Sequence, residues 1–301
     1  MTDKKTVVSV SLGSSTRNAT IEAELLGNKI AIERRGTDGD LTRAEAEIRQ
    51  LDGKVDAIGL GGTDLFVTAG KRRYYIRDSV RLARNAQNTP VVCGAGLKNT
   101  LERRVVKQLD PAMLWRNKKV LMLSGTDRYG MAEALTQAGA DIVFGDLIFI
   151  LGLPVVLKSL GALRTMASLL GPVVTNLPIS WLYPTGNRQE TSVIGWRTRY
   201  FDQAEVIAGD FLLLKRYAPE DLSGKIVLTN TTTADDVAML RQRGVSKLIT
   251  TTPRYNGRSL ATNLLEATFL AISGKTELSD QEYLDLLEQS GLGPDVIDLT
   301  T

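Results

Sequence analysis

The segment of residues 119–146 constrains the fold of this chain more than any other stretch of its sequence. It opens with the apolar run 120–123, turns at Ser124-Gly125 and continues with apolar residues at helical spacing; a second apolar run, 142–144, then leads to Asp146. This order predicts a strand, a tight turn, a helix and a second strand. Asp146 follows the turn by about 20 residues, where dinucleotide-binding units place the acid that contacts the ribose.

The rest of the C-terminal half repeats this rhythm. Three further predicted strands, 205–208, 225–228 and 247–250, end in polar loops and alternate with helical stretches. The predicted fold class is therefore α/β, with a mixed α/β N-terminal domain followed by a doubly wound, Rossmann-like domain built on a parallel sheet. The expected divisions are residues 1–112 for a substrate domain, residues 113–255 for the nucleotide-binding domain, and residues 256–301 for C-terminal helices that pack back on the N-terminal domain.

Missing residue types exclude several kinds of chemistry. The 301 residues include no histidine, which excludes Ser-His-Asp triads, imidazole acid–base catalysis and His-containing metal sites, and we expect no metal. The single cysteine, Cys93, cannot form an internal disulfide, and no apolar signal segment follows the N-terminus, so we expect a cytoplasmic protein. A formal net charge of +3 and short basic clusters without interleaved aromatic residues predict no nucleic-acid binding.

A nucleotide is expected at the carboxyl edge of the C-terminal sheet. Backbone amides of 125–130 at a helix N-terminus can bind a pyrophosphate, Arg128 can add charge, and Asp146 can accept both ribose hydroxyls while repelling a 2′-phosphate. This favours NAD over NADP, although Asp127 adds a negative charge near the phosphates, and a sheet that binds no dinucleotide is the alternative. The residues expected to contact the cofactor are Gly125, Thr126, Asp127, Arg128, Gly130, Asp146, Asn230 and Thr231.

Candidate catalytic residues lie in polar loops of the N-terminal half. Without histidine, proton transfer from a secondary alcohol requires Lys, Asp, Glu or Tyr, and Lys98 follows a strand in a glycine-rich stretch that can face the crevice. A carboxylate, Asp38 or Asp64, can hold this lysine and relay the proton. Asn99 and Thr100 adjoin Lys98 and are expected to contact the substrate.

Three short motifs resemble the shikimate/quinate 5-dehydrogenase family. Ser9-Val10-Ser11 resembles its Ser-x-Ser, Thr37-Asp38-Gly39 resembles its Thr-Asp-Gly, and residues 257–267 resemble the late helix that closes its substrate cleft. The resemblance implies that Ser9 and Ser11 bind the substrate carboxylate and that Asp38 works with a lysine on the hydroxyl that is oxidised. It also implies a quinate- or shikimate-like substrate.

The stretch 147–184 is unusually apolar. Pro154, Lys158 and Arg164 interrupt it, so it cannot form a transmembrane helix. A buried helix pair, a subunit-contact surface and an interfacial membrane contact around 178–184 remain open, in decreasing order of preference. We expect a homodimer and a small-molecule substrate.

These observations together predict an NAD(H)-dependent oxidoreductase that acts on a small hydroxylated carboxylate. A non-catalytic nucleotide-binding assembly or regulatory protein, which uses the surface of 147–184 to bind a partner, is an alternative. Another reaction on the same scaffold, such as group transfer, is a third possibility, because the fold does not fix the function.

Overall fold

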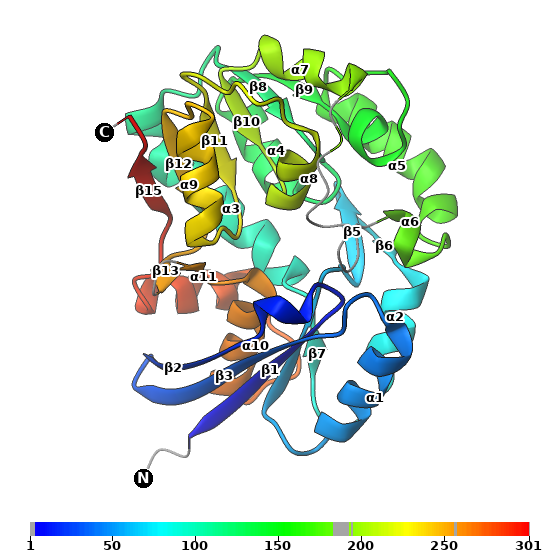
Figure 1. Cartoon of the computed structure of the whole chain (residues 1–301). Helices are drawn as coiled ribbons and strands as arrows, with labels where there is room; N and C mark the ends of the chain where they lie inside the picture. Colours follow the sequence, from blue (N-terminus) through cyan, green and yellow to red (C-terminus); the bar gives the residue numbers. More distant parts are fainter. Residues whose placement is uncertain (1–3, 183–192, 194, 256–257, 301) are drawn as a thin grey trace.

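Two α/β domains face each other in the computed structural model, which describes residues 4–182, 193, 195–255 and 258–300 (Figure 1). Each domain has its own sheet of mainly parallel strands, and the sheet of the second domain has a doubly wound strand order. The predicted fold class is thus confirmed.

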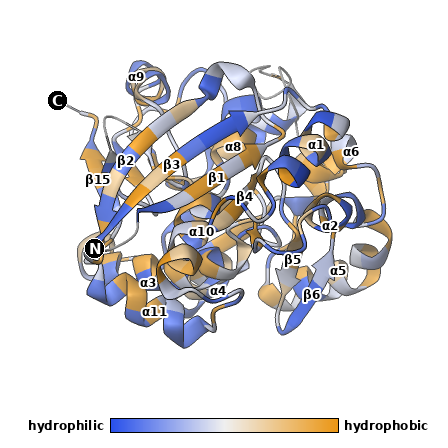
Figure 2. Cartoon of the chain, turned by 90° about the horizontal axis from the view of Figure 1, so that it is seen from below, coloured by the Kyte–Doolittle hydropathy of each residue, from blue (hydrophilic) through white to orange (hydrophobic). Residues whose placement is uncertain are grey.

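The N-terminal sheet has the strand order β2-β3-β1-β4-β7, in which β1 is parallel to both of its neighbours and β2 is antiparallel to β3. Its strands are β1 (Lys5–Ser11), β2 (Ala19–Leu25), β3 (Asn28–Gly36), β4 (Ala57–Gly61) and β7 (Val91–Val92). Hydrophobic residues concentrate on the central strands β1 and β4, whereas the edge strand β2 alternates with polar residues (Figure 2). This pattern is typical of a sheet with a buried centre and a half-exposed edge.

Helices cover both faces of this sheet. Val8 and Val10 pack against α1 (Leu41–Leu51) and α2 (Arg77–Ala83), while Val7 belongs to a core shared with α10 (Thr262–Ser273). The approach of α10 is very close: a Cβ atom on Gly59 would lie 2.9 Å from the carbonyl oxygen of Asn263. Only glycine at this position allows the late helix to reach the sheet.

The C-terminal sheet has the order β15-β12-β11-β10-β8-β9, and all neighbours are parallel except β15. Its strands are β8 (Lys119–Met122), β9 (Asp141–Phe144), β10 (Val206–Ala208), β11 (Ile226–Thr229), β12 (Lys247–Thr250) and β15 (Asp295–Asp298). After β8 the chain forms β9, which pairs with one edge of β8, and then crosses to form β10, which pairs with the other edge of β8. The strand order therefore reverses at β8, the place where such sheets bind ligands.

Helix α4 (Tyr129–Gln137) packs on one face of this sheet, and α8 (Phe211–Tyr217) and α9 (Ala234–Gln242) pack on the other. Side chains of the central strands are buried on both sides, as expected for a parallel sheet between helical layers.

A long helix, α3 (Ala95–Met113), joins the two domains and packs against α4, α10 and α11 (Asp280–Gln289). The prediction that Lys98 lies in a polar loop is wrong, because the helix begins at Ala95, directly after Gly94 with its φ of 90°. Gly130 of α4 packs tightly on α3: a Cβ atom there would lie 2.3 Å from the carbonyl oxygen of Asn99. One hydrophobic core consequently runs through both domains.

The described part of the apolar stretch, 147–182, contains most of a π-helical turn and two helices. The other elements of the described residues are η1 (Ser15–Arg17), β5 (Phe66–Ala69), β6 (Arg72–Tyr75), η2 (Asp146–Ile150), α5 (Leu160–Val174), α6 (Ile179–Leu182), η4 (Trp196–Thr198), α7 (Arg199–Asp202), β13 (Arg254–Tyr255) and β14 (Arg258–Ser259). Within the described ranges, no helix combines the length and the apolar character that crossing a membrane requires. Tyr183 and Pro184 of the interfacial stretch considered above, and Gly257 of the late segment, lie outside the described residues.

Candidate functional site

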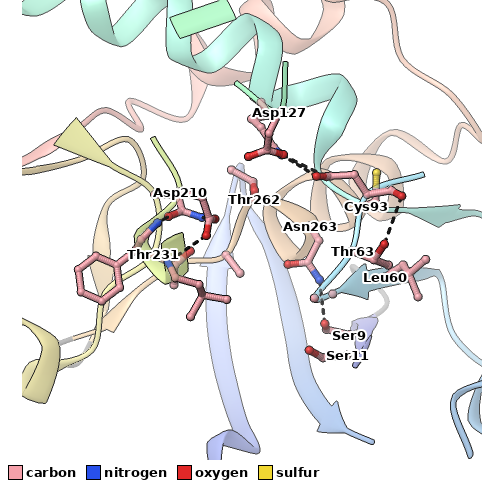
Figure 3. Close-up of a pocket in the computed structure, with 18 of the residues that line it drawn as sticks. Ser9, Ser11, Leu60, Thr63, Cys93, Asp127, Asp210, Thr231, Thr262 and Asn263 are labelled. Carbon is pink, nitrogen blue, oxygen red and sulfur yellow. Dashed lines mark hydrogen bonds and ion pairs between the residues drawn. The ribbon is translucent and has the colours of Figure 1, made fainter. Parts of the chain in front are cut away.

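A cavity of about 270 Å³ lies between the domains and is lined by the carboxyl ends of strands from both sheets. Ser9, Ser11 and Thr63 come from the N-terminal domain, and Asp127 and Asp210 come from the C-terminal domain (Figure 3). A concave site between two domains, with apolar walls and a few converging polar groups, is the usual place for a small-molecule ligand.

Lys98 is the centre of a buried ionic cluster in the wall of this cavity. It lies in the first turns of α3, and its Nζ donates to Asp64 Oδ1 at 3.1 Å and to Asp127 Oδ1 at 3.0 Å. The three side chains are only 6%, 9% and 13% exposed. Asp64 follows β4 and Asp127 follows β8, so the cluster connects the two sheets.

Burial and mutual charge separate the proton affinities of these groups. Burial raises the pKa of Asp64 to about 8, with Lys98 opposing the shift and the charge of Asp127 adding to it. Burial would also raise the pKa of Asp127, but the charges of Lys98 and Arg128 hold it well below its usual range. Burial opposes the charge of Lys98, whereas Asp127 and Asp64 raise its pKa above the ordinary value. Near neutral pH, Asp64 is therefore the member that exchanges a proton.

This assignment predicts a pH-dependent stability. Because the pKa of Asp64 is raised to about 8 in the folded state, its contribution is fully present below about pH 4 and is lost as pH rises towards 8. The free energy of unfolding should fall by at most about 1.4 kcal/mol per pH unit for this one proton. Urea unfolding at several pH values should show a shallower fall for Asp64→Asn than for the wild type. Asp235→Asn, at an exposed position in the first turn of α9, is the control, and equal slopes for all three proteins would contradict the assignment.

Arg128 lines the cavity, but its guanidinium is already surrounded by carboxylates. It pairs with Glu102, and it lies 3.4 Å from both Asp127 and Asp210. Arg128 and Glu102 are almost completely buried, at 2% and 0% side-chain exposure. The expected role of Arg128 as a phosphate ligand is not supported by this arrangement, because its charge is used inside the protein.

Asp146 is also bound within the protein. Its Oδ2 accepts from the Gly125 amide at 2.9 Å, and its Oδ1 accepts from the Thr126 amide at 2.9 Å and the Thr126 hydroxyl at 2.7 Å. Burial raises the pKa of Asp146, while these hydrogen bonds oppose the shift. The carboxylate expected to bind a ribose instead holds the turn after β8, and it occupies two of the amides expected to bind the pyrophosphate.

The two glycines of the turn have packing roles. A Cβ atom on Gly125 would lie 2.8 Å from both Phe144 and Leu163. Gly130 permits the contact between α4 and the backbone of Asn99 described above. Neither glycine lines the cavity, whereas Thr126 and Asp127, between them in the chain, do.

The serines of the N-terminal domain lie in the cavity wall. Asn263 Nδ2 donates to Ser9 Oγ at 2.8 Å (Figure 3), and Arg34 donates to Ser11 Oγ at 3.0 Å. Asn263 belongs to the late segment that the sequence singled out, whereas Arg34 on β3 carried no recognisable signal. These contacts place a basic, hydroxyl-rich group of side chains at the end of the cavity that the N-terminal domain lines. This end is called the N-terminal end below, and the end lined by the C-terminal domain is called the C-terminal end.

Three other predicted site residues lie elsewhere. Asp38 is in an exposed turn with a φ of 56°, where it accepts from the Ser15 amide at 2.7 Å and pairs with Arg43. Its expected role beside Lys98 is wrong, because Asp64 takes that position. Asn99 and Thr100 lie in α3 outside the cavity wall, since a residue adjacent to Lys98 on a helix faces another direction.

The loops after β10 and β11 complete the C-terminal side. Asn230 Nδ2 donates to Asp210 Oδ2 at 3.0 Å, and Asn230 Oδ1 accepts from the Phe211 amide at 3.1 Å. Asp210 Oδ1 accepts from the Leu212 amide at 2.9 Å and caps α8. Asn230 and Thr231, both expected in the crevice, line the cavity, and Asp210 adds a carboxylate to the same wall.

The buried glutamate Glu266 fixes the start of the helix that carries Lys98. Its carboxylate accepts from the amides of Gly94 at 2.5 Å and Leu97 at 3.3 Å, and from the hydroxyl of Tyr283 at 2.7 Å. Nothing in the sequence pattern distinguished Glu266 from other residues of an amphipathic helix. Its role follows only from the packing of α10 and α11 on α3.

No curated protein matches this sequence. Among solved structures, a galactofuranose binding protein is 11% identical over 95% of this chain and 98% of its own, with a TM-score of 0.36. The malic enzyme of Entamoeba histolytica is 12% identical over 92% of this chain and 60% of its own, with a TM-score of 0.42. Rp1789 of Rhodopseudomonas palustris is 11% identical over 95% of this chain and 88% of its own, with a TM-score of 0.42.

Two family models match the chain, and they meet at the start of α3. The first, described as a domain of unknown function (DUF8753), matches residues 6–93. The second, described as a domain of unknown function (DUF8754), matches residues 96–299, which is more than half of the sequence. The chain therefore belongs to the DUF8754 family, with a DUF8753 domain preceding that match.

Proposed function

We propose that the protein is an enzyme that moves a proton at a hydroxyl group, or at the carbon next to a carbonyl group, of a small hydroxylated carboxylate bound between its domains. The observation that carries this proposal is the position of Lys98 between Asp64 and Asp127, buried in the wall of a cavity. Strongly shifted ionisable groups in a cleft are more frequent at active sites than elsewhere.

The chemistry follows from the charges. Lys98 keeps its proton near neutral pH and stabilises negative charge that develops on a substrate oxygen. Asp64, with a pKa raised to about 8, accepts the proton or returns it. Asp127 stays ionised and holds the ammonium group in place.

The N-terminal end of the cavity is suited to the carboxylate of the substrate. Ser9, Ser11 and Arg34 can donate hydrogen bonds or supply positive charge there. This assignment agrees with the carboxylate-binding role implied for the two serines by the Ser-x-Ser resemblance.

NAD(H)-dependent oxidation of the hydroxyl group is the form of the reaction that the sequence favours. The pyrophosphate of NAD is expected on the turn after β8. That turn does not fit a diphosphate, because Asp146 accepts from two of its amides and carboxylates surround Arg128. The proton-transfer steps above therefore involve only residues of the chain.

The proposal is tested by incubating the protein with quinate and related hydroxylated carboxylates, and with the corresponding keto acids, in D₂O. Proton NMR follows conversion, or deuterium incorporation at the carbon next to the carbonyl group, with and without NAD⁺ or NADP⁺. We expect conversion or exchange that disappears in Lys98→Met. Strict dependence on NAD⁺ would identify the reaction as the dehydrogenation predicted from the sequence, and identical rates with and without protein would contradict the proposal.

A second candidate function, partner binding, is favoured by one specific observation. Leu169 and Val173 on α5 and Trp181 on α6 are 71%, 63% and 72% exposed. Exposed apolar groups of this size gather at protein interfaces more often than elsewhere on a surface. This surface is where we propose that a homodimer forms.

If a homodimer forms through this surface, introducing charged residues there should prevent dimerisation. Light scattering should give twice the mass of the chain for the wild type, and Leu169→Lys/Val173→Lys should give a monomer, because lysines on this face would be buried in the contact. If the wild type is a monomer at every protein concentration tested, the proposal that this surface is a subunit interface is wrong.

A further inference from the structure

Four backbone amides that follow β8 and β10, in or beside the cavity wall, are already hydrogen-bonded within the chain. Asp146 accepts from Gly125 and Thr126 after β8, and Asn230 and Asp210 accept from Phe211 and Leu212 after β10. In nucleotide-binding sheets of this order, such amides are the groups that bind phosphate. Here the chain's own side chains take their place.

The charged residues at the C-terminal end of the cavity also disfavour a phosphate ligand. Lys98 and Arg128 supply two positive charges, and Glu102, Asp127 and Asp210, which pair with them, are three acidic residues. Asp127 has a pKa held far below its usual range, so it is ionised at any pH near neutral. A diphosphate at this end would meet like charge in a partly buried site, where repulsion is weakly screened.

What this end offers to a ligand is hydrogen-bond acceptors. Asp210 and Asp127 contribute carboxylate oxygens, and Asn230, Thr231 and Thr126 add side-chain oxygens in the same wall. Asp210 keeps 23% of its side chain exposed. Carboxylates of this kind are good acceptors for the hydroxyl groups of a neutral ring or chain.

The two ends of the cavity therefore differ in charge. Arg17 and Arg34 lie at the N-terminal end, Asp127 and Asp210 lie at the C-terminal end, and Lys98 contacts Asp127. A ligand with one anionic group and several hydroxyl groups matches this distribution in one orientation only.

We propose that the C-terminal end of the cavity binds the uncharged, hydroxyl-bearing part of the substrate, and that the domain does not bind a dinucleotide at its strand-reversal point. This inference rests on the proposed function for the identity of the substrate as a hydroxylated carboxylate. Asp146 then stabilises the turn in the absence of a phosphate, and Asp210 selects for hydroxyl groups.

Calorimetry with matched probes tests both statements. Quinate and cyclohexanecarboxylate share a carboxylate on a six-membered ring and differ in the hydroxyl groups. We expect quinate to bind at least about tenfold more tightly, which corresponds to one or two well-placed hydrogen bonds. NAD⁺ and inorganic pyrophosphate should give no saturable heat below about 1 mM.

Variants connect the result to the site. Asp210→Ser keeps a residue that can cap α8 and removes the carboxylate, so it should weaken quinate binding at least about fivefold while leaving cyclohexanecarboxylate unchanged. Asp235→Ser, at the exposed start of α9, is the matched control and should change neither affinity.

Several outcomes would overturn the inference. NAD⁺ binding with a Kd below about 1 mM would do so, and it would leave the proposed function intact if turnover still requires Lys98. Equal affinity for the two acids, or no binding of either acid, would also overturn it. Hydroxyl-dependent binding without any Lys98-dependent turnover would instead support this inference and contradict the proposed function.

Discussion

Replacing Arg128 by methionine is expected to lower the free energy of unfolding by about 3–5 kcal/mol, the usual effect of removing one partner of a buried ion pair. Glu102 is completely buried and contacts Arg128 directly. Without the guanidinium, its carboxylate must either remain charged in a medium of low polarity or take up a proton. Asp127 keeps Lys98 as a partner and Asp210 is 23% exposed, so the loss is concentrated at Glu102.

The double variant Arg128→Met/Glu102→Leu is the decisive control. Because two apolar groups of similar volume can replace a buried ion pair at little cost, it should recover at least half of the stability lost in Arg128→Met. Urea unfolding, followed by circular dichroism, measures both proteins. A double variant as unstable as the single one would show that Arg128 acts through packing and not through its charge.

The pH dependence gives a second measurement. Burial raises the pKa of Glu102, and removal of Arg128 takes away the charge that opposes this shift. A raised pKa in the folded state means that stability is present below the unfolded value of about 4.5 and is lost as pH rises. The difference between the wild type and Arg128→Met should therefore be smaller at pH 5 than at pH 8.

Sequence periodicity predicted the fold class because each parallel strand leaves a local signal. Strands such as β8 are buried on both faces and read as short apolar runs, and glycine or a polar loop marks where each run ends. The start of helix α3 was not predicted by these local signals. Gly94-Ala95-Gly96 looks like a loop, yet Glu266, which lies far away in the sequence, binds the amides of Gly94 and Leu97.

The candidate site was predictable where position along a strand decided it. Lys98, Asp64, Ser9 and Ser11 follow or end strands of one sheet, and the sheet brings all four to the cavity. Asp38 follows β3 of the same sheet, but its turn directs it towards Arg43 at the surface.

The assignments at 125–130 were not predictable from the same pattern, because partners distant in the sequence decide them. Asp127 is bound by Lys98, Arg128 is bound by Glu102, and the Gly125 amide is bound by Asp146. The sequence pattern of a strand, a turn, a helix and a following acidic residue is the same in both cases: the acidic residue can bind a ribose, or it can bind the backbone of the turn.

Replacing Lys98 by methionine is expected to reduce turnover by a factor of about 10²–10⁴, the usual contribution of a positioned acid–base group. Substrate affinity should change only severalfold, since Lys98 is held by Asp64 and Asp127 and the substrate carboxylate is assigned to other side chains. Loss of the ammonium group also removes the charge that lowers the pKa of Asp64, so that carboxyl becomes a still weaker acid and a poor proton donor.

The matched control is Lys107→Met, on the exposed side of the same helix, which should keep full turnover. Lys98→Arg separates charge from geometry: it keeps the positive charge, but its planar guanidinium cannot replace an ammonium group that donates to Asp64 and Asp127 at about 3 Å. We expect Lys98→Arg to bind substrate and to remain at least about tenfold slower than the wild type. Substrate NMR gives the rates, and calorimetry gives the affinities. Full turnover in Lys98→Met would remove the buried cluster from the reaction and leave it the structural role of joining the two sheets.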